Sequence, residues 1–154
     1  MKLHWRNAGL AVAIALTVVT LSRCSDVAPC AVCPNVEGRY TLVHKESAIS
    51  SGCDSNYQPP LELSLSREGS ALTANYNNAV LTGTLYDTYD MVLNGSQQAG
   101  AGRTVTTRLR ARYIEPLPSS DAGAKLDGRV TRDLISADGG VCSVEHELTG
   151  HKAP

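Results

Sequence analysis

Much of the chain alternates between apolar and polar residues in short runs. The segment 61–66 reads Leu-Glu-Leu-Ser-Leu-Ser, and the segments 103–114 and 125–135 show the same period of two. Successive side chains point to opposite faces of a β-strand, so this pattern predicts strands with one buried and one solvated face. Sustained helical spacing is absent from residue 36 onward, which predicts an all-β domain.

Residues that favour tight turns separate these runs: Glu68-Gly69, Asn77-Asn78, Asp87 to Asp90, Asn94-Gly95 and Asp138-Gly139-Gly140. Such residues tolerate positive φ or hydrogen-bond their own backbone, as hairpins require. About eight strands are expected, over 36–45, 60–67, 71–77, 79–86, 90–95, 103–114, 125–135 and 141–149. Short connections favour antiparallel neighbours. The expected fold is therefore an antiparallel up-and-down barrel or barrel-like sandwich, preceded by a signal peptide helix.

Closure of such a barrel places the first strand beside the last, running antiparallel, and removes unpaired edges. Cys53 follows the first strand by a few residues, and Cys142 opens the last strand. Both therefore come to the same rim, which predicts a Cys53–Cys142 disulfide across the closing seam. Three strand glycines, at Gly38, Gly83 and Gly128, are expected to mark bends or close backbone approaches.

The N-terminus has the organisation of an export signal. Lys2 and Arg6 precede an apolar run at 8–19, which is shorter than the roughly 20 residues that span a bilayer. The segment resembles a bacterial lipoprotein signal, because Leu21, Ser22 and Cys24 match that motif, whereas Arg23 replaces its usual small residue. The resemblance implies lipidation of Cys24 and a membrane anchor. Cleavage after Ser22, releasing a soluble secreted protein, is the alternative.

These features predict a signal peptide at 1–23, a tether at 24–35, a β-barrel domain at 36–150 and a tail at 151–154. The expected location is the cell envelope outside the cytoplasm, as an outer-membrane-anchored lipoprotein or a secreted or periplasmic protein. The signal holds three of the 14 Lys and Arg residues and none of the 15 Asp and Glu, so the remainder has 11 basic and 15 acidic residues, a formal charge of −4. This balance argues against nucleic acid as a partner.

The chain has five cysteines, and lipidation of Cys24 leaves an even number for an oxidising compartment. Cys30 and Cys33 are expected to form a small-loop disulfide within the tether or to pair with another chain. A redox dithiol of this spacing normally begins a helix, and none is predicted here. A zinc site would need Cys53 and Cys142 as further ligands.

Two further sets of side chains are candidates for binding. His44 and His146 share the inward parity of their strands, but no third metal ligand is identified, so neither a metal nor a cofactor is expected. Arg108, Arg110 and Arg112 line one strand face, where they contact either an anionic glycan or lipid headgroup, or Asp127 and Asp133 on a neighbouring strand.

The opening Gly38-Arg39-Tyr40, a cysteine soon after it, alternating hairpins and a cysteine in the final strand resemble small lipocalin-like (calycin-type) barrels and exported bacterial lipoproteins. The resemblance implies a small apolar ligand inside the barrel. We expect a non-catalytic binding protein, with ligand-binding residues that the sequence does not identify. The alternative is an interaction or inhibitor module that contacts an envelope protein through loops 46–59 and 115–124. No residues for an enzyme are apparent.

Overall fold

The computed structural model describes residues 27–45, 48, 53, 57–116, 118 and 123–153. These residues form a closed barrel of eight antiparallel strands in sequential order. The strands are β1 (Gly38–Lys45), β2 (Glu62–Glu68), β3 (Ala71–Tyr76), β4 (Ala79–Leu85), β5 (Asp90–Gln98), β6 (Thr104–Ile114), β7 (Lys125–Ile135) and β8 (Val141–Lys152). The all-β barrel expected from the period-two pattern is confirmed. The expected signal peptide helix at 1–23 lies outside the described residues.

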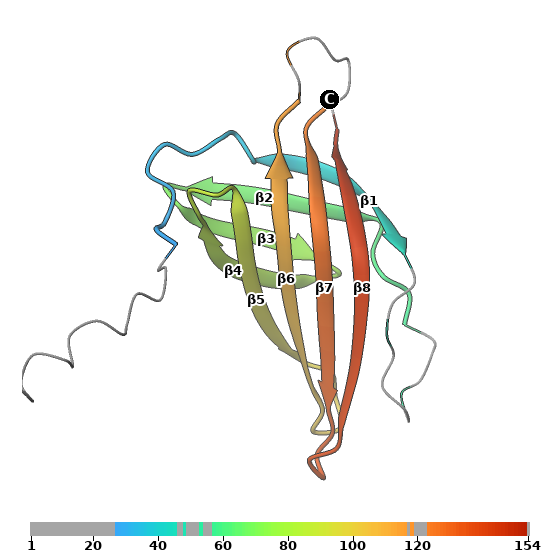
Figure 1. Cartoon of the computed structure of the whole chain (residues 1–154). Helices are drawn as coiled ribbons and strands as arrows, with labels where there is room; N and C mark the ends of the chain where they lie inside the picture. Colours follow the sequence, from blue (N-terminus) through green and yellow to red (C-terminus); the bar gives the residue numbers. More distant parts are fainter. Residues whose placement is uncertain are drawn as a thin grey trace, which may run out of the picture.

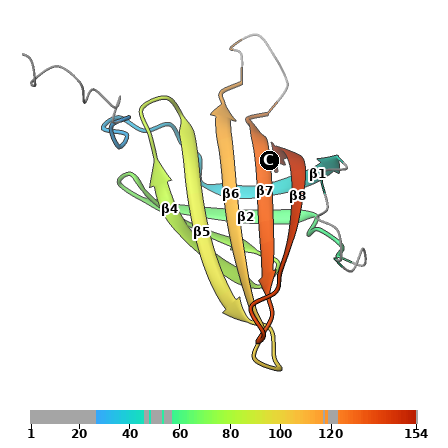
Figure 2. The same ribbon diagram turned by 60° about the horizontal axis from the view of Figure 1, so that its bottom comes forward.

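The barrel is flattened, with β1 and β2 crossing β6, β7 and β8 at a steep angle (Figures 1 and 2). It closes through six antiparallel residue pairs between β1 and β8, from Tyr40 opposite Lys152 to Lys45 opposite Glu147. No helix in the described part of the chain has the length and apolar character to cross a bilayer.

The barrel interior is filled mainly by leucine, with smaller contributions from alanine, valine, methionine and tyrosine. On β3 and β6 every second side chain is buried, as the alternating pattern predicts. The largest fully buried side chains are Tyr40, Tyr76, Leu63, Leu72, Leu81, Leu85, Met91, Leu93, Leu109, Leu126, Leu148 and Val36. Burial of this apolar surface is the main contribution that stabilises the fold.

Glycines allow the strands to pack more closely than a side chain would permit. A Cβ at Gly128 would overlap the carbonyl oxygen of Arg110 and the Cα of Ala111, and a Cβ at Gly83 would overlap the carbonyl oxygen of Val92. These atoms belong to the main chain and cannot move aside cheaply. The prediction of close backbone approach at these two positions is therefore confirmed.

Most of the predicted turns are present, and the prediction of one turn is wrong. Asn77 and Asn78 adopt positive φ in the β3–β4 hairpin. Asn94-Gly95 is not a turn: it lies inside β5, which continues to Gln98. Gly95 faces inward, where a Cβ would come within 2.5 Å of the Leu81 side chain, so the glycine serves close packing here.

The segment expected to be a tether packs against the barrel from residue 27 onward. We call residues 27–37 the strap. Pro29 forms a β-bridge with Tyr86, and the amide of Cys30 donates to the carbonyl of Leu85 at 2.9 Å. Val36 is fully buried within the core. The strap therefore closes one end of the barrel, beside the β4–β5 turn (Figure 1).

Two side chains of the barrel, Tyr40 and Lys152, form hydrogen bonds to main-chain carbonyls in the second half of the strap. The Tyr40 hydroxyl donates to the carbonyl of Val36 at 2.7 Å, and the Lys152 ammonium donates to the carbonyl of Asn35 at 2.9 Å. Lys152 and His151 were expected in a tail, but both belong to β8 and pair with β1. The last barrel strand thus extends beyond the expected limit at residue 150, and the strap packs against the barrel before the expected limit at residue 36.

Candidate functional site

The candidate site is the end of the barrel opposite the strap, which we call the mouth. It is formed by inward-facing side chains near the ends of β1, β3, β7 and β8, together with Tyr57 from the β1–β2 connection. These side chains are His44, Tyr57, Tyr76, Arg132 and His146. The mouth is therefore lined by four rings and one guanidinium group, whereas most of the buried interior is aliphatic.

The two histidines lie together, as their shared inward parity predicted. Their ring centroids are 6.0 Å apart, in an edge-to-face arrangement. His44 Nε2 lies 2.8 Å from the carbonyl oxygen of Pro60, and a carbonyl only accepts, so Nε2 carries the proton. The other nitrogen of this ring, Nδ1, is buried and has no hydrogen-bond partner in the described structure. In the neutral form of the ring, Nδ1 holds a lone pair without a partner in the described structure.

His146 shows the complementary arrangement. Burial lowers its pKa and the neighbouring His44 lowers it further, whereas the main-chain carbonyl of Lys45 raises it. Nε2 of His146 is buried without a partner, so the N–H that faces Lys45 is on Nδ1. The net effect keeps this imidazole neutral at physiological pH, with its Nε2 lone pair unused.

Two tyrosines and one arginine complete the mouth. The Tyr57 ring lies 5.7 Å from the His146 ring, and the Arg132 guanidinium lies over its face at 4.4 Å from the centroid. Tyr76 is 1% exposed. The Tyr57 and Tyr76 hydroxyls approach each other, yet neither makes a well-formed hydrogen bond to any described residue. Burial raises the pKa of both phenols, and Arg132 opposes this effect.

The Cys53–Cys142 disulfide holds the β1–β2 connection at the mouth. The predicted bond is present, with the two Cα atoms 5.3 Å apart. The carbonyl of Ala48 also accepts from the Glu145 amide at 3.0 Å, so β8 holds the connection at residue 48 as well as at Cys53. Together these bonds fix the segment that carries Tyr57 and Pro60 against the histidines.

The second cysteine pair lies at the opposite end of the barrel. Cys30 and Cys33 form a disulfide inside the strap, and Cys30 is 6% exposed. The hypothesis of a four-cysteine zinc site is therefore wrong, because the two pairs are oxidised and far apart in the fold. Two disulfides are compatible with an extracytoplasmic location. Cys24 lies outside the described residues.

The outward arginines make local contacts on the β5–β7 face. Arg112 forms an ion pair with Asp90 at 2.8 Å, and Arg108 donates to Asn94 at 3.0 Å. The partner of Arg112 is thus on β5, whereas the sequence suggested Asp127 on β7. The Asp90–Arg112 hydrogen bonds lower the pKa of Asp90. Cross-strand pairs of this exposed kind contribute little to stability.

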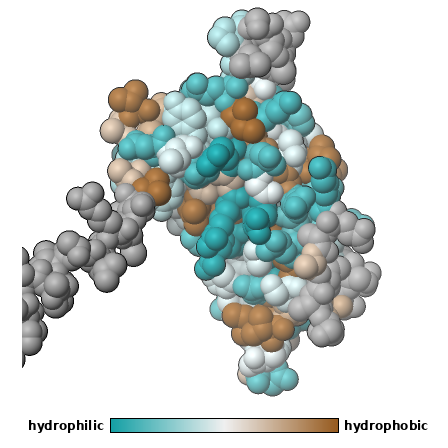
Figure 3. All heavy atoms as spheres, viewed as in Figure 1, coloured by the Kyte–Doolittle hydropathy of each residue, from teal (hydrophilic) through white to brown (hydrophobic). Residues whose placement is uncertain are grey.

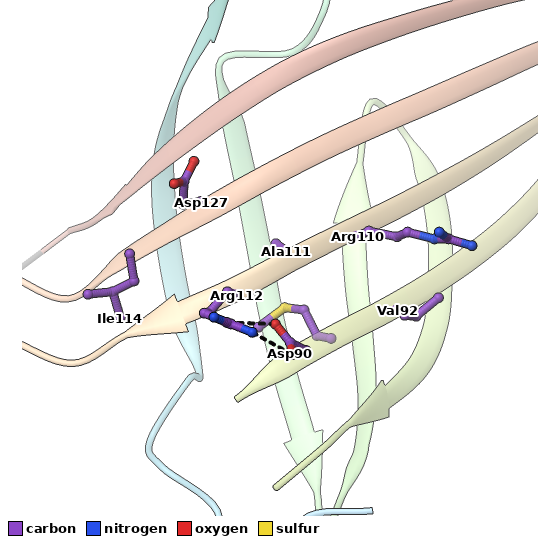
Figure 4. A pocket seen from close by; sticks show the side chains of 8 residues that line it. Asp90, Val92, Arg110, Ala111, Arg112, Ile114 and Asp127 are labelled. Atoms are coloured by element: carbon purple, nitrogen blue, oxygen red, sulfur yellow. Dashed lines mark hydrogen bonds and ion pairs between the residues drawn. The ribbon is translucent and has the colours of Figure 1, made fainter. Parts of the chain in front are cut away.

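Arg110 extends away from this ion pair beside a shallow hollow of about 430 Å³ (Figure 4). Its register partner on β7 is Arg129, so two like charges face each other across the strands. The surrounding surface over β5–β8 is mainly hydrophilic, with separate hydrophobic patches (Figure 3). Within the row, Arg112 is charge-paired and Arg108 is hydrogen-bonded, whereas Arg110 lies exposed opposite a like charge.

Sequence reasoning identified the histidines but missed Tyr57, Tyr76 and Arg132. The signal for Arg132 was present, because it shares the inward parity of Val130 and Leu134 on a strand with otherwise apolar inward positions. Tyr76 likewise continues the buried parity of β3. Tyr57 is brought to the mouth by the disulfide and had no signal in the pattern.

Comparisons with known proteins assign neither a family nor a function to this chain. No family model matches the chain, and neither curated proteins nor solved structures gave a match. The closed eight-stranded barrel agrees with the lipocalin-like architecture, and kinship with that family is not shown. The function therefore has to be argued from the mouth.

Proposed function

We propose that this protein is an exported, lipid-anchored and non-catalytic binding protein whose barrel takes a small ligand at the mouth. One observation carries the proposal: a ring nitrogen of each histidine is buried there without a hydrogen-bond partner in the described structure, and the buried Tyr57 and Tyr76 hydroxyls approach only each other, without a well-formed hydrogen bond. Buried polar groups in folded proteins are nearly always satisfied, and leaving one unsatisfied costs about 1–3 kcal/mol. A ligand that satisfies them removes this cost.

The ligand is expected to be amphipathic. Its polar end would meet the histidine nitrogens and the phenols, and its apolar part would lie against the aliphatic interior. The barrel interior beyond the mouth is already filled by side chains such as Leu63, Leu85 and Leu93, which are fully buried. This supports binding near the mouth and a ligand of small size.

The strap supports a definite orientation on the membrane. The Pro29 bridge to Tyr86 fixes the chain five residues after Cys24. At about 3.5 Å per residue, a lipid on Cys24 would hold the strap end within roughly 18 Å of the bilayer. The mouth would then face away from the membrane. All other cysteines are paired with one another, so cysteine parity also favours modification of Cys24.

The experiment has two measurements on protein purified from the envelope of a bacterial host. Mass spectrometry of the N-terminal peptide should find an acylated Cys24, whereas a free Arg23 amine would exclude the anchor and favour the soluble alternative. Native mass spectrometry without added ligand should find a small molecule that is released on unfolding. His146→Gln should lose this molecule, while His151→Gln, at the strap end, should keep it. Bare protein in every preparation would contradict ligand binding.

The alternative function, a protein-interaction module, depends on loops 46–59 and 115–124. Most of these residues lie outside the described structure. No described residue of these loops gives a specific reason to prefer that function.

A further inference from the structure

We infer that the mouth binds a divalent transition-metal ion through His44 Nδ1 and His146 Nε2. The inference goes beyond the proposed function, because it assigns an ion rather than an organic molecule to the same two histidine nitrogens. The juxtaposition of the two rings, with centroids 6.0 Å apart, is the geometric basis.

The orientation of each ring is that of a metal-ligating histidine. Such histidines almost always bind the ion with one nitrogen and donate the other N–H to a carbonyl or carboxylate, which fixes the ring. His44 uses Nε2 on the carbonyl of Pro60, and His146 faces the carbonyl of Lys45. In each ring the remaining nitrogen is buried and unpartnered among the described residues. The unpartnered nitrogen is Nδ1 in His44 and Nε2 in His146, and both atoms are buried at the mouth.

Two phenols belong to the same group of side chains at the mouth as the histidines. Tyr76 is 1% exposed, and its hydroxyl is buried without a well-formed hydrogen bond. The Tyr57 ring lies 5.7 Å from the His146 ring. The phenols of this pair are candidates for a further ligand. A phenol that binds the ion would release its proton to solvent. Burial raises the pKa of both phenols and opposes this step, whereas the positive charge of Arg132 lowers the pKa and assists it.

The donor set selects the kind of ion. No cluster of three or more His, Cys, Asp or Glu residues occurs in the described ranges, so hard ions such as Ca²⁺ and Mg²⁺ lack their carboxylate ligands. Imidazole suits Cu²⁺ and Zn²⁺. Two imidazoles with a phenol leave coordination positions for solvent, so the ion should exchange readily.

The matched variants are His44→Gln, His146→Gln and His151→Gln. His151 is exposed on β8 at the strap end, and its replacement removes one imidazole without touching the mouth. The protein should carry no polyhistidine tag, have both disulfides formed and be freed of metal before titration. Circular dichroism checks that each variant keeps the barrel.

Isothermal titration with Cu²⁺ and Zn²⁺ should show one ion per chain. Each mouth variant should lower the affinity by about 100-fold or more, since loss of a direct ligand exceeds the usual effect of a supporting residue, and His151→Gln should leave it unchanged. Electron paramagnetic resonance of the Cu²⁺ complex should show coupling to two imidazole nitrogens. Ca²⁺ and Mg²⁺ should not bind.

Absence of binding, or equal binding by the mouth variants and the wild type, would overturn the metal inference. Equal loss in His151→Gln would do the same, because it would place the ion elsewhere. If native mass spectrometry then finds an organic molecule that His146→Gln loses, the proposed ligand-binding function stands without the metal. If it finds neither ion nor molecule, both proposals fail.

Discussion

Removal of the Cys53–Cys142 disulfide should strongly destabilise the barrel, because this bond closes the longest loop in the domain. The cysteines are 89 residues apart in sequence. Cross-linking restricts the unfolded chain, and the loop-closure relation gives about 4.6 kcal/mol for a loop of about 90 residues. The bond also joins β8 to the β1–β2 connection at the barrel seam.

The second disulfide provides a matched control in the same protein. Cys30 and Cys33 are only three residues apart. The same relation gives about 1.9 kcal/mol for a loop of about four residues, so the two double-alanine variants should differ by about 2.8 kcal/mol.

Urea-induced unfolding can be followed by tyrosine fluorescence and far-ultraviolet circular dichroism at pH 7. The unfolding free energy should be highest for the wild type, lower for Cys30→Ala/Cys33→Ala and lowest for Cys53→Ala/Cys142→Ala. A loss of less than about 2 kcal/mol for the long-range pair, or a larger loss for the short-range pair, would refute the reasoning, since typical native disulfides contribute 2–4 kcal/mol.

Three further changes test the packing and the mouth. Gly128→Ala should lower the unfolding free energy by about 3 kcal/mol in urea titration, because the new methyl group meets main-chain atoms of β6; Gly123→Ala, which meets only ordinary contacts, should cost far less, and equal costs would contradict close packing. Tyr40→Phe should cost about 1–2 kcal/mol by the same measurement, since the carbonyl of Val36 loses a buried donor; an unchanged value would show that the bond does not hold the strap. Burial lowers the pKa of His146 below 6.5 in the folded state, so the unfolded state binds the proton more readily, and stability should fall as pH drops through 6.5 and level off below the folded pKa; His146→Gln should lack this part of the pH dependence, and an identical profile would contradict it.

The fold was accessible from the sequence because period-two alternation and turn chemistry are local signals. β7 begins and ends where the pattern places it, at Lys125 and Ile135. The Asn94-Gly95 turn was wrong because the same dipeptide serves a different purpose within a strand, where Gly95 admits the Leu81 side chain. Only the packing across β4 and β5 distinguishes these uses.

The candidate site was accessible in part. Inward parity brought His44 and His146 together correctly, since barrel closure follows from strand order. Which nitrogen of each ring stays free depends on the carbonyls of Pro60 and Lys45, and no sequence pattern encodes those contacts. The strap was misread because composition alone described it: its two prolines and lack of large apolar groups are typical of a linker, whereas Val36 and Cys30 are in fact buried in the core.

The most direct test of the mouth is a long-range proton–nitrogen NMR spectrum of the histidine side chains at pH 7, with and without one equivalent of Zn²⁺. The account predicts that His44 carries a proton on Nε2 and His146 a proton on Nδ1. It also predicts that Zn²⁺ shifts the signals of His44 Nδ1 and His146 Nε2, while the signals of His151 stay unchanged. Matching tautomers, or a Zn²⁺ response confined to His151, would contradict it.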